Sequence, residues 1–235
     1  MIPNFHAYVD ELFHDWNYGH PKILYGFIRA MKPQVVVEVG TYRGYAACWM
    51  ARALQENGSG RLYCIDNFQL TEHVHKYGDP RKHCEDNFAK CGVSDVITIL
   101  EGRSDEVEWP EKVDMAYIDG WHSHKQASAD FIKAAAQGAK LIALDDTDVC
   151  FGPRYFADNW IDEDWDSILI SSDNGMGIFK RKEDRRLITF SQEMPHPNPG
   201  VDIRGLTKDQ QIAHLEASGS KQLSHYVRFG LTEHI

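Results

Sequence analysis

The amino-acid sequence predicts a doubly wound α/β fold with a mostly parallel sheet. Short apolar runs, often β-branched, alternate with longer segments of helical apolar spacing, which is typical of consecutive βαβ units. In addition, four of the five runs expected to form parallel strands end in acidic or glycine-bearing segments. Ligands of open α/β sheets bind beyond the carboxyl ends of the strands, so this edge of the sheet is where we expect a functional site. A length of 235 residues suits one such domain with appendages.

Two helical segments precede the first strand. Asn4–Trp16 and His20–Met31 have helical apolar spacing, with Pro21 near the start of the second segment and Pro33 after its end. The same reasoning predicts the later helices, each by its apolar spacing and most by a glycine that follows the segment. These later helices are Tyr45–Gln55, Arg81–Cys91, Lys125–Ala136 and the short segment Arg154–Trp160.

The predicted strands are short and apolar. Val35–Val39 is a continuous β-branched run around Glu38, which suits a parallel strand that is buried on both faces. Four further runs complete the parallel part of the sheet: Arg61–Ile65, Val96–Leu100, Val113–Ile118 and Ala139–Leu144. Ser167–Ser171 and Gly177–Lys180 flank the turn signal Asn174-Gly175, so we expect a final antiparallel hairpin.

The C-terminal part of the chain has a different character. Lys180–Arg186 is charged, Met194–Gly200 is a proline-rich linker, and Thr207–Ser218 has a helical pattern with Thr207 as its N-cap. We therefore divide the chain into a domain over residues 1–184, which includes the N-terminal helices, and an extension over residues 185–235. The extension is too short for a core of its own. We expect it to cover the substrate side or to lie across a homodimer, and the sequence favours neither placement.

Composition and charge exclude several classes of partner. The formal net charge of −10 argues against nucleic acid, and no stretch approaches the roughly 20 apolar residues of a membrane span. The N-terminus lacks the basic and apolar run of a secretory peptide, so we expect an unprocessed cytoplasmic protein. The five cysteines form no CxxC pair and predict neither a zinc ribbon nor a disulfide framework. Each cysteine is expected to be a small buried hydrophobe.

The loop after the first strand, Glu38 to Gly44, is the first candidate binding element. It lacks the second and third glycines of the dinucleotide fingerprint G-x-G-x-x-G, so a pyrophosphate would not find its close backbone approach. The loop resembles instead the wider E-x-G-x-x-x-G turn of class I S-adenosylmethionine-dependent methyltransferases. This resemblance implies that the loop wraps the amino-acid part of S-adenosylmethionine. The residues implied in cofactor binding are Glu38, Gly40, Thr41, Tyr42 and Gly44.

Other strand ends would complete the cofactor site. Asp66 ends the second strand, and the resemblance implies that its carboxylate accepts both ribose hydroxyls, which suits a group that only accepts when ionised. Arg103 and Ser104 follow the third strand, where relatives contact adenine; in the alternative interpretation Ser104 is only a helix N-cap. Asp119, after the fourth strand, is also assigned to the cofactor. The long segment Gln69–Pro80 is expected to act as a lid over the cofactor.

The ends of the fourth and fifth strands narrow the resemblance. Met115–His122 and Leu141–Thr147 resemble the metal-dependent small-molecule O-methyltransferases, a group that includes macrocin, sugar and catechol O-methyltransferases. The resemblance spans roughly Val35–Lys180 and implies a Rossmann-like methyltransferase sheet. It also implies a hydroxylated small molecule as the substrate, and we expect a homo-oligomer as the assembly.

The acidic residues at these two strand ends predict a divalent metal site. Neighbouring parallel strands lie about 4.8 Å apart, so Asp119, Asp145 and Asp146 can converge on one ion. Three hard oxygen ligands favour Mg²⁺ or Mn²⁺. In the alternative interpretation, Asp145-Asp146-Thr147 merely caps the following helix.

His122 is the candidate general base. It lies three residues after Asp119, and an unperturbed pKa near 6.5 suits proton abstraction at neutral pH. In the catechol-type relatives that offset holds a lysine, and His124 is a nearby competitor. The sequence thus predicts an O-methyltransferase in which Asp119 and His122 are catalytic. The alternative is a protein of the same fold that has another group-transfer activity or a non-catalytic binding role.

Overall fold

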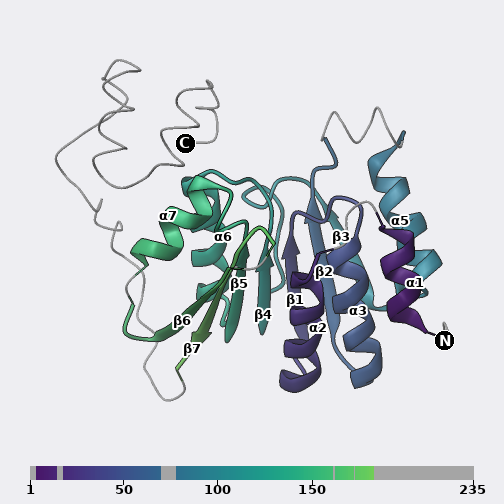
Figure 1. Ribbon diagram of the computed structural model, residues 1–235, viewed down its shortest axis with the longest axis horizontal. Helices are drawn as coiled ribbons and strands as arrows, with labels where there is room; N and C mark the ends of the chain where they lie inside the picture. The colour runs from purple at the N-terminus through teal and green to yellow at the C-terminus, as the bar shows by residue number, and fades with distance from the viewer. Residues whose placement is uncertain (1–3, 15–17, 70–77, 161, 172, 183–235) are drawn as a thin grey trace.

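A seven-stranded sheet with helices on both of its faces forms the centre of the computed structural model (Figure 1). The structure describes residues 4–14, 18–69, 78–160, 162–171 and 173–182. The strand order is β3-β2-β1-β4-β5-β7-β6. The strands are β1 (Val35–Val39), β2 (Arg61–Asp66), β3 (Ile97–Glu101), β4 (Met115–Ile118), β5 (Leu141–Asp145), β6 (Trp165–Ile170) and β7 (Met176–Arg181).

The pairing of these strands confirms the predicted fold class. Strands β3, β2, β1, β4 and β5 pair in parallel, whereas β7 pairs antiparallel with both β5 and β6. The order reverses between β1 and β4, and this reversal is the place where a doubly wound sheet opens a crevice for a ligand. The loops after β1 and β4 lie at this reversal.

The helices agree with the sequence prediction in number and approximate position over the described residues. They are α1 (Phe5–Leu12), α2 (His20–Met31), α3 (Tyr45–Asn57), α5 (Pro80–Cys91), α6 (His124–Ala136) and α7 (Phe151–Asn159), with a 3-10 turn, η1 (Ser94–Val96), before β3. The prediction of α2 is confirmed at both ends. Helix α7 begins at Phe151 rather than at Arg154. Residues 103–107 form a turn instead of a helix, so the N-cap interpretation of Ser104 is wrong.

Two buried clusters fill the space between the sheet and its helices. Val36 of β1 packs in the cluster with α1, α2, α3 and α5, whereas the next residue, Val37, packs in the cluster with α6 and α7. Because successive side chains of a strand point to opposite faces, both faces of β1 are covered, as its continuous apolar run predicted. Phe131 of α6 anchors the second cluster and contacts the rings of Phe156 and Phe179.

The turn between β6 and β7 reaches back to the start of the chain. The Asp173 side chain accepts a hydrogen bond of 2.8 Å from the backbone N–H of Gly19, the residue before α2. A helix N-terminus leaves backbone N–H groups without intrahelical partners, and a carboxylate there stabilises the helix. The hairpin therefore ties the N-terminal helix α2 to the strand-end edge of the sheet.

Some predictions fall on residues that the structure does not describe. Most of the predicted lid lies in residues 70–77, and the linker, the last helix and the whole extension lie in residues 183–235. The division of the chain at residue 184 stays a prediction for the same reason. Within the described ranges, no helix has the length and apolar character needed to cross a membrane.

Candidate functional site

The glycine loop after β1 adopts a backbone conformation that requires glycine at two positions. Gly40 has φ +86°, and a Cβ atom there would lie 2.0 Å from the backbone oxygen of Asp119. Gly44 also has φ +86°, and its Cβ would lie 2.5 Å from the ring of Phe88. Any side chain at Gly40 would therefore push the loop away from the end of β4. The glycine loop is thus in direct contact with Asp119, the residue that follows β4.

Asp66 organises this loop. One carboxylate oxygen accepts hydrogen bonds of 2.8 Å from the backbone N–H groups of both Thr41 and Tyr42. The other oxygen accepts a hydrogen bond of 2.7 Å from the backbone N–H of Phe68. A carboxylate has about four acceptor positions, so roughly one remains for a ligand. Binding of ribose by Asp66 stays a prediction, and the structure adds a second role in holding the loop.

Glu38 is buried beneath the loop. Burial raises the pKa of its carboxyl group to about 8; hydrogen bonds from Thr41 and Cys64 oppose that shift, and the nearby Asp119 and Asp66 reinforce it. Its Oε2 atom has no hydrogen-bond partner among the described residues. Glu38 is therefore a neutral carboxylic acid at pH 7 in this state, and its own Oε2 atom is the one left unsatisfied.

Arg103 and Ser104, the predicted adenine contacts, have different surroundings. Arg103 is exposed and forms an ion pair of 2.9 Å with Asp105. Ser104 is buried, its hydroxyl accepts a hydrogen bond of 2.9 Å from Gln126 of α6, and its carbonyl oxygen accepts one of 2.9 Å from Lys133. The structure thus fixes Ser104 against α6. Contact of either residue with a cofactor stays a prediction.

The Tyr117 hydroxyl links two of the predicted metal ligands. It lies 2.5 Å from Asp145 Oδ2 and 3.1 Å from Asp119 Oδ2, so Asp119 and Asp145 do converge, as their positions at neighbouring strand ends predicted. Burial and the charge of Asp145 raise the pKa of Asp119 to about 7, although its contact with His122 opposes the shift. Burial and the same two carboxylates raise the pKa of Tyr117 well above its usual value, so its hydroxyl stays protonated as a donor.

His20, the first residue of α2, completes this cluster. Its ring is fully buried, and Nδ1 lies 2.6 Å from Asp145 Oδ1. The sequence analysis missed this histidine as a site residue. A signal was present, because His20, Leu24 and Ile28 recur at four-residue spacing and all three are fully buried. A histidine on the apolar face of a helix needs a polar partner inside the protein.

His122 lies on the other side of Asp119. Its Nε2 atom is 3.0 Å from Asp146 Oδ2 and 3.9 Å from Asp119 Oδ1. Burial disfavours the charged ring, but hydrogen bonds with Asp119, Asp146 and Cys150 raise the pKa of His122 to about 12. The same contact lowers the pKa of Asp146 against the effect of burial. The ring is therefore cationic at neutral pH in this state, and the role of His122 as a base stays a prediction.

Cys150 belongs to the same group of side chains. Its Sγ atom is 3.8 Å from Asp146 Oδ2, and ligand atoms of His122, Asp146 and Cys150 all lie within 4.8 Å of one another. The expectation of a buried hydrophobe holds for the other four cysteines, whereas Cys150 is only partly buried. The competing base His124 lies on α6, where its ring packs edge-on against Tyr155 at 4.9 Å.

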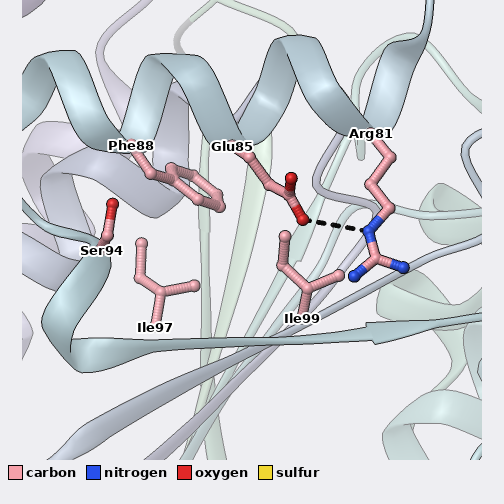
Figure 2. Close-up of a pocket in the computed structure, with 6 residues that line it drawn as sticks. All are labelled: Arg81, Glu85, Phe88, Ser94, Ile97 and Ile99. Atoms are coloured by element: carbon pink, nitrogen blue, oxygen red, sulfur yellow. Dashed lines mark hydrogen bonds and ion pairs between the residues drawn. The ribbon is translucent and has the colours of Figure 1, made fainter.

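A pocket elsewhere on the molecule is separate from these strand ends. It lies between α5 and β3 and is lined by Arg81, Glu85, Phe88, Ser94, Ile97 and Ile99 (Figure 2). Arg81 forms an ion pair of 3.1 Å with Glu85 there. The Phe88 ring also packs against Gly44, so this ring separates the pocket from the glycine loop. The pocket contains none of the predicted site residues.

Comparison with known proteins supports the fold described above, and the region matched by a family model includes the glycine loop. A family model described as a methyltransferase domain matches residues 37–146. Two rice proteins named protein arginine N-methyltransferase PRMT10, from Oryza sativa subsp. japonica and subsp. indica, are each 28% identical to the chain over 88 residues. That match covers 37% of this chain and only 19% of each relative.

Solved O-methyltransferase structures share the fold over most of the described chain. A putative O-methyltransferase from Klebsiella pneumoniae aligns with a TM-score of 0.58 and 17% identity, covering 77% of this chain and 91% of that chain. The O-methyltransferase TomG from Streptomyces achromogenes, solved with S-adenosylmethionine, aligns at 0.56 and 19% identity over 77% and 91%. An O-methyltransferase from Bacillus cereus aligns at 0.57 and 17% identity over 77% and 92%. The predicted resemblance to class I S-adenosylmethionine-dependent methyltransferases of the O-methyltransferase type is thereby confirmed.

Proposed function

We propose that this protein is a class I S-adenosylmethionine-dependent methyltransferase that transfers a methyl group to a hydroxyl oxygen of a small molecule, with the help of a divalent cation. One observation carries the proposal. Asp119, Asp145, Asp146 and His122 gather at the ends of β4 and β5, directly beside the glycine loop after β1. A methyl donor held by the loop and an acceptor held by the acidic residues would therefore meet at a shared border.

The residues around the glycine loop fit a cationic cofactor. S-adenosylmethionine supplies an electrophilic methyl group on a positively charged sulfur. Glu38 lies under the loop with an unsatisfied oxygen and a pKa of about 8, which burial raises. A positive charge close by favours the ionised form of a carboxyl group. Glu38 thus suits a site where positive charge arrives only with the ligand, and Asp66 holds the loop in place around it.

The acidic residues fit a hard divalent cation. Asp119, Asp145 and Asp146 offer the carboxylate oxygens that Mg²⁺ prefers. They would hold the ion once Asp145 turns away from His20 and Tyr117, which its two oxygens contact in this structure. When bound, such an ion lowers the pKa of a hydroxyl that it contacts. In the present structure the cationic ring of His122 supplies positive charge between Asp119 and Asp146. The carboxylates are therefore arranged to bind positive charge.

The remaining steps are assigned to residues of this chain. Asp119 orients the acceptor hydroxyl beside the glycine loop, and His122 takes the hydroxyl proton on Nε2. His122 does so only in its neutral form, which requires that Asp119 and Asp146 no longer hold the imidazolium. The substrate oxygen then forms its bond to the methyl carbon as the carbon–sulfur bond breaks, and S-adenosylhomocysteine leaves as a neutral thioether. Much of the rate enhancement would come from positioning.

The test is transfer of a labelled methyl group from S-adenosylmethionine to a panel of phenols, catechols and sugars, with Mg²⁺ or with EDTA. We expect turnover with Mg²⁺, loss of turnover in EDTA and retention of most cofactor binding. Full activity in EDTA would remove the cation from the proposal. Methylation of nitrogen or carbon nucleophiles alone would contradict O-methylation. Cofactor binding without any methyl transfer would favour the non-catalytic alternative.

Two substitutions address the assigned residues. Asp66→Ala should weaken S-adenosylmethionine binding in calorimetry by an order of magnitude or more, because a charged acceptor worth about 1.5–3 kcal/mol is lost. Asp86→Ala, at an exposed position on α5, is the matched control and should bind normally. His122→Ala should lower kcat by about 10²–10⁴-fold, the usual range for a lost general base. An unchanged rate would move the base to another residue, with His124 tested next.

The C-terminal extension is assigned on the sequence alone. We propose that residues 185–235 cover the substrate side of the site or lie across a homodimer. Truncation after Lys182 distinguishes the two placements, because loss of substrate affinity indicates the first and loss of dimerisation the second. A truncated protein that is monomeric, active and equally stable would exclude both.

A further inference from the structure

We propose that His122, Asp146 and Cys150 form a binding site for a borderline divalent cation such as Zn²⁺ or Co²⁺, and that occupancy of this site blocks methyl transfer. The binding part of the proposal stands on the structure alone. The inhibitory part rests on the proposed function, because it requires His122 to act as the base. The two parts are tested by separate measurements.

The ligand atoms are already close to the spacing of a tetrahedral site. His122 Nε2 and Asp146 Oδ2 are 3.0 Å apart, Cys150 Sγ and Asp146 Oδ2 are 3.8 Å apart, and all three atoms lie within 4.8 Å. Bonds of about 2.0–2.3 Å to nitrogen, oxygen and sulfur place tetrahedral zinc ligands roughly 3.3–3.7 Å from one another. Small side-chain rotations would therefore be enough to bind an ion.

The backbone around the three ligands is fixed independently of any ion. A Cβ atom on Gly152 would lie 2.2 Å from the backbone oxygen of His122, so only glycine allows the first turn of α7 to pack directly against His122. Cys150 donates its backbone N–H to Asp146 O at 2.9 Å, and Asp146 itself has φ +59°. This close packing brings Cys150 to His122 although the two residues come from different strand–helix loops.

The residues after Asp146 are fixed as well. Thr147 and Asp148 donate backbone hydrogen bonds of 3.1 and 2.8 Å to Gly175 and Asn174 in the β6–β7 turn. The loop that carries Asp146 and Cys150 is thus attached to the hairpin on one side and to α7 on the other. Such an arrangement lowers the ordering cost of binding an ion.

The donor set determines the class of cation. A thiolate, an imidazole nitrogen and a carboxylate suit Zn²⁺ and Co²⁺, whereas Mg²⁺ prefers oxygen ligands and octahedral geometry. Binding of the ion would release the protons of the His122 ring and the Cys150 thiol, and the resulting two anionic ligands and one neutral ligand would balance a charge of +2. Asp145, a member of the all-oxygen set predicted from the sequence, has its two oxygens directed at His20 and Tyr117 instead.

Solvent has access to the site. The side chain of His122 is 33% exposed and that of Asp146 is 12% exposed, and Cys150 is partly exposed. A free ligand position would remain for water, as in zinc sites that exchange a fourth ligand. An ion bound here would occupy the Nε2 lone pair of His122, and this ring could then take no proton from a substrate. We therefore expect inhibition by Zn²⁺.

Binding is tested with Co²⁺ alone, added to the reduced, metal-free full chain and followed by absorption. We expect a thiolate-to-cobalt charge-transfer band in the near ultraviolet together with visible bands of tetrahedral intensity. Cys150→Ala should remove the charge-transfer band and weaken Co²⁺ binding at least tenfold, and His122→Gln should weaken it similarly. Thermal unfolding of each metal-free variant controls for loss of fold. A weak octahedral spectrum in the unsubstituted protein, or a band that persists in Cys150→Ala, would overturn the site.

Inhibition is tested in the methyl-transfer assay at saturating Mg²⁺. Zn²⁺ should inhibit the unsubstituted protein, and Cys150→Ala should need at least tenfold more Zn²⁺ for the same fractional inhibition of its own Mg²⁺ activity. Equal sensitivity of the two proteins would overturn the inhibitory part. If no substrate is methylated, the proposed function fails while the cobalt spectrum still decides on the site. If methylation occurs without the thiolate band, the site fails while the function stands.

Discussion

The two halves of the candidate site are held together by different means. The glycine-loop half, at the ends of β1 and β2, is where we propose that the cofactor binds, and it is held by backbone: Gly40 lies against the carbonyl of Asp119, and Asp66 accepts three backbone N–H groups. The acidic half, at the ends of β4 and β5, is held by side chains from distant elements, among them His20 and Cys150. A backbone conformation that requires a particular residue type can be recognised in the sequence, whereas contacts between side chains from distant elements cannot.

The largest effect is expected where the two halves touch. Gly40→Ala places a Cβ atom 2.0 Å from the backbone oxygen of Asp119 at a φ of +86°, so the loop or β4 must move. We expect a loss of at least about 4 kcal/mol in the free energy of unfolding in urea, or no folded protein. Gly58→Ala is the matched control, because its φ is +73° but nothing lies within 4 Å of its Cβ. It should cost only about 1 kcal/mol. Equal effects would show that the close approach does not matter.

Replacing His20 tests the side-chain half. His20→Leu leaves the buried Asp145 without its partner at 2.6 Å, and breaking a buried pair costs about 3–5 kcal/mol. His20→Asn keeps an N–H donor near the position of Nδ1 and should recover a substantial part of the stability. Urea unfolding of both variants measures the difference. If leucine and asparagine behave alike, the polar contact with Asp145 is not what stabilises this half.

The pH dependence of the free energy of unfolding distinguishes the two halves further. The folded-state pKa of Glu38 is about 8, raised by burial from 4.5, so the folded protein holds a proton that the unfolded chain releases. Stability should therefore fall as pH rises from about 4.5 to about 8. Glu38→Gln should remove about 1–3 kcal/mol of that fall, and the rest should persist because Asp119, with a pKa of about 7, titrates in the same direction. Glu108→Gln, at an exposed position, should keep the pH dependence of stability of the unsubstituted protein. If Glu38→Gln shows the same pH dependence as Glu108→Gln, the raised pKa of Glu38 is contradicted.

The smallest effect is expected outside both halves. Arg81 pairs with Glu85 and Glu101 beside the pocket between α5 and β3, but all three side chains are between 43% and 49% exposed. Exposed ion pairs contribute about 0–1 kcal/mol. Arg81→Ala should therefore change the free energy of unfolding by less than about 1 kcal/mol and leave cofactor binding intact. A larger loss in calorimetry or urea unfolding would make this pocket part of the site.

The sequence predicted the fold well because its signals are local. Helix α2 has the predicted bounds, and the glycines after α3 and α5 end those helices at φ values of +73° and +64°. The sequence also predicted that Asp119 and Asp145 converge, because neighbouring strands end together. It could not predict that Gly152 would let α7 pack against His122, because no local pattern encodes the angle at which a helix leaves its strand.

The hydrogen bond from Gly19 to Asp173 also bears on the order in which a growing chain becomes organised. This bond spans 154 positions, whereas the bonds between Asp66 and the glycine loop span 24 and 25. Contacts between remote positions form late, because the long loop between them must close first. On the ribosome, the nascent chain can form its glycine loop soon after β2 emerges. The acidic half must wait for the last hairpin, so the part of the site that we propose to bind the cofactor forms before the part that we propose to react.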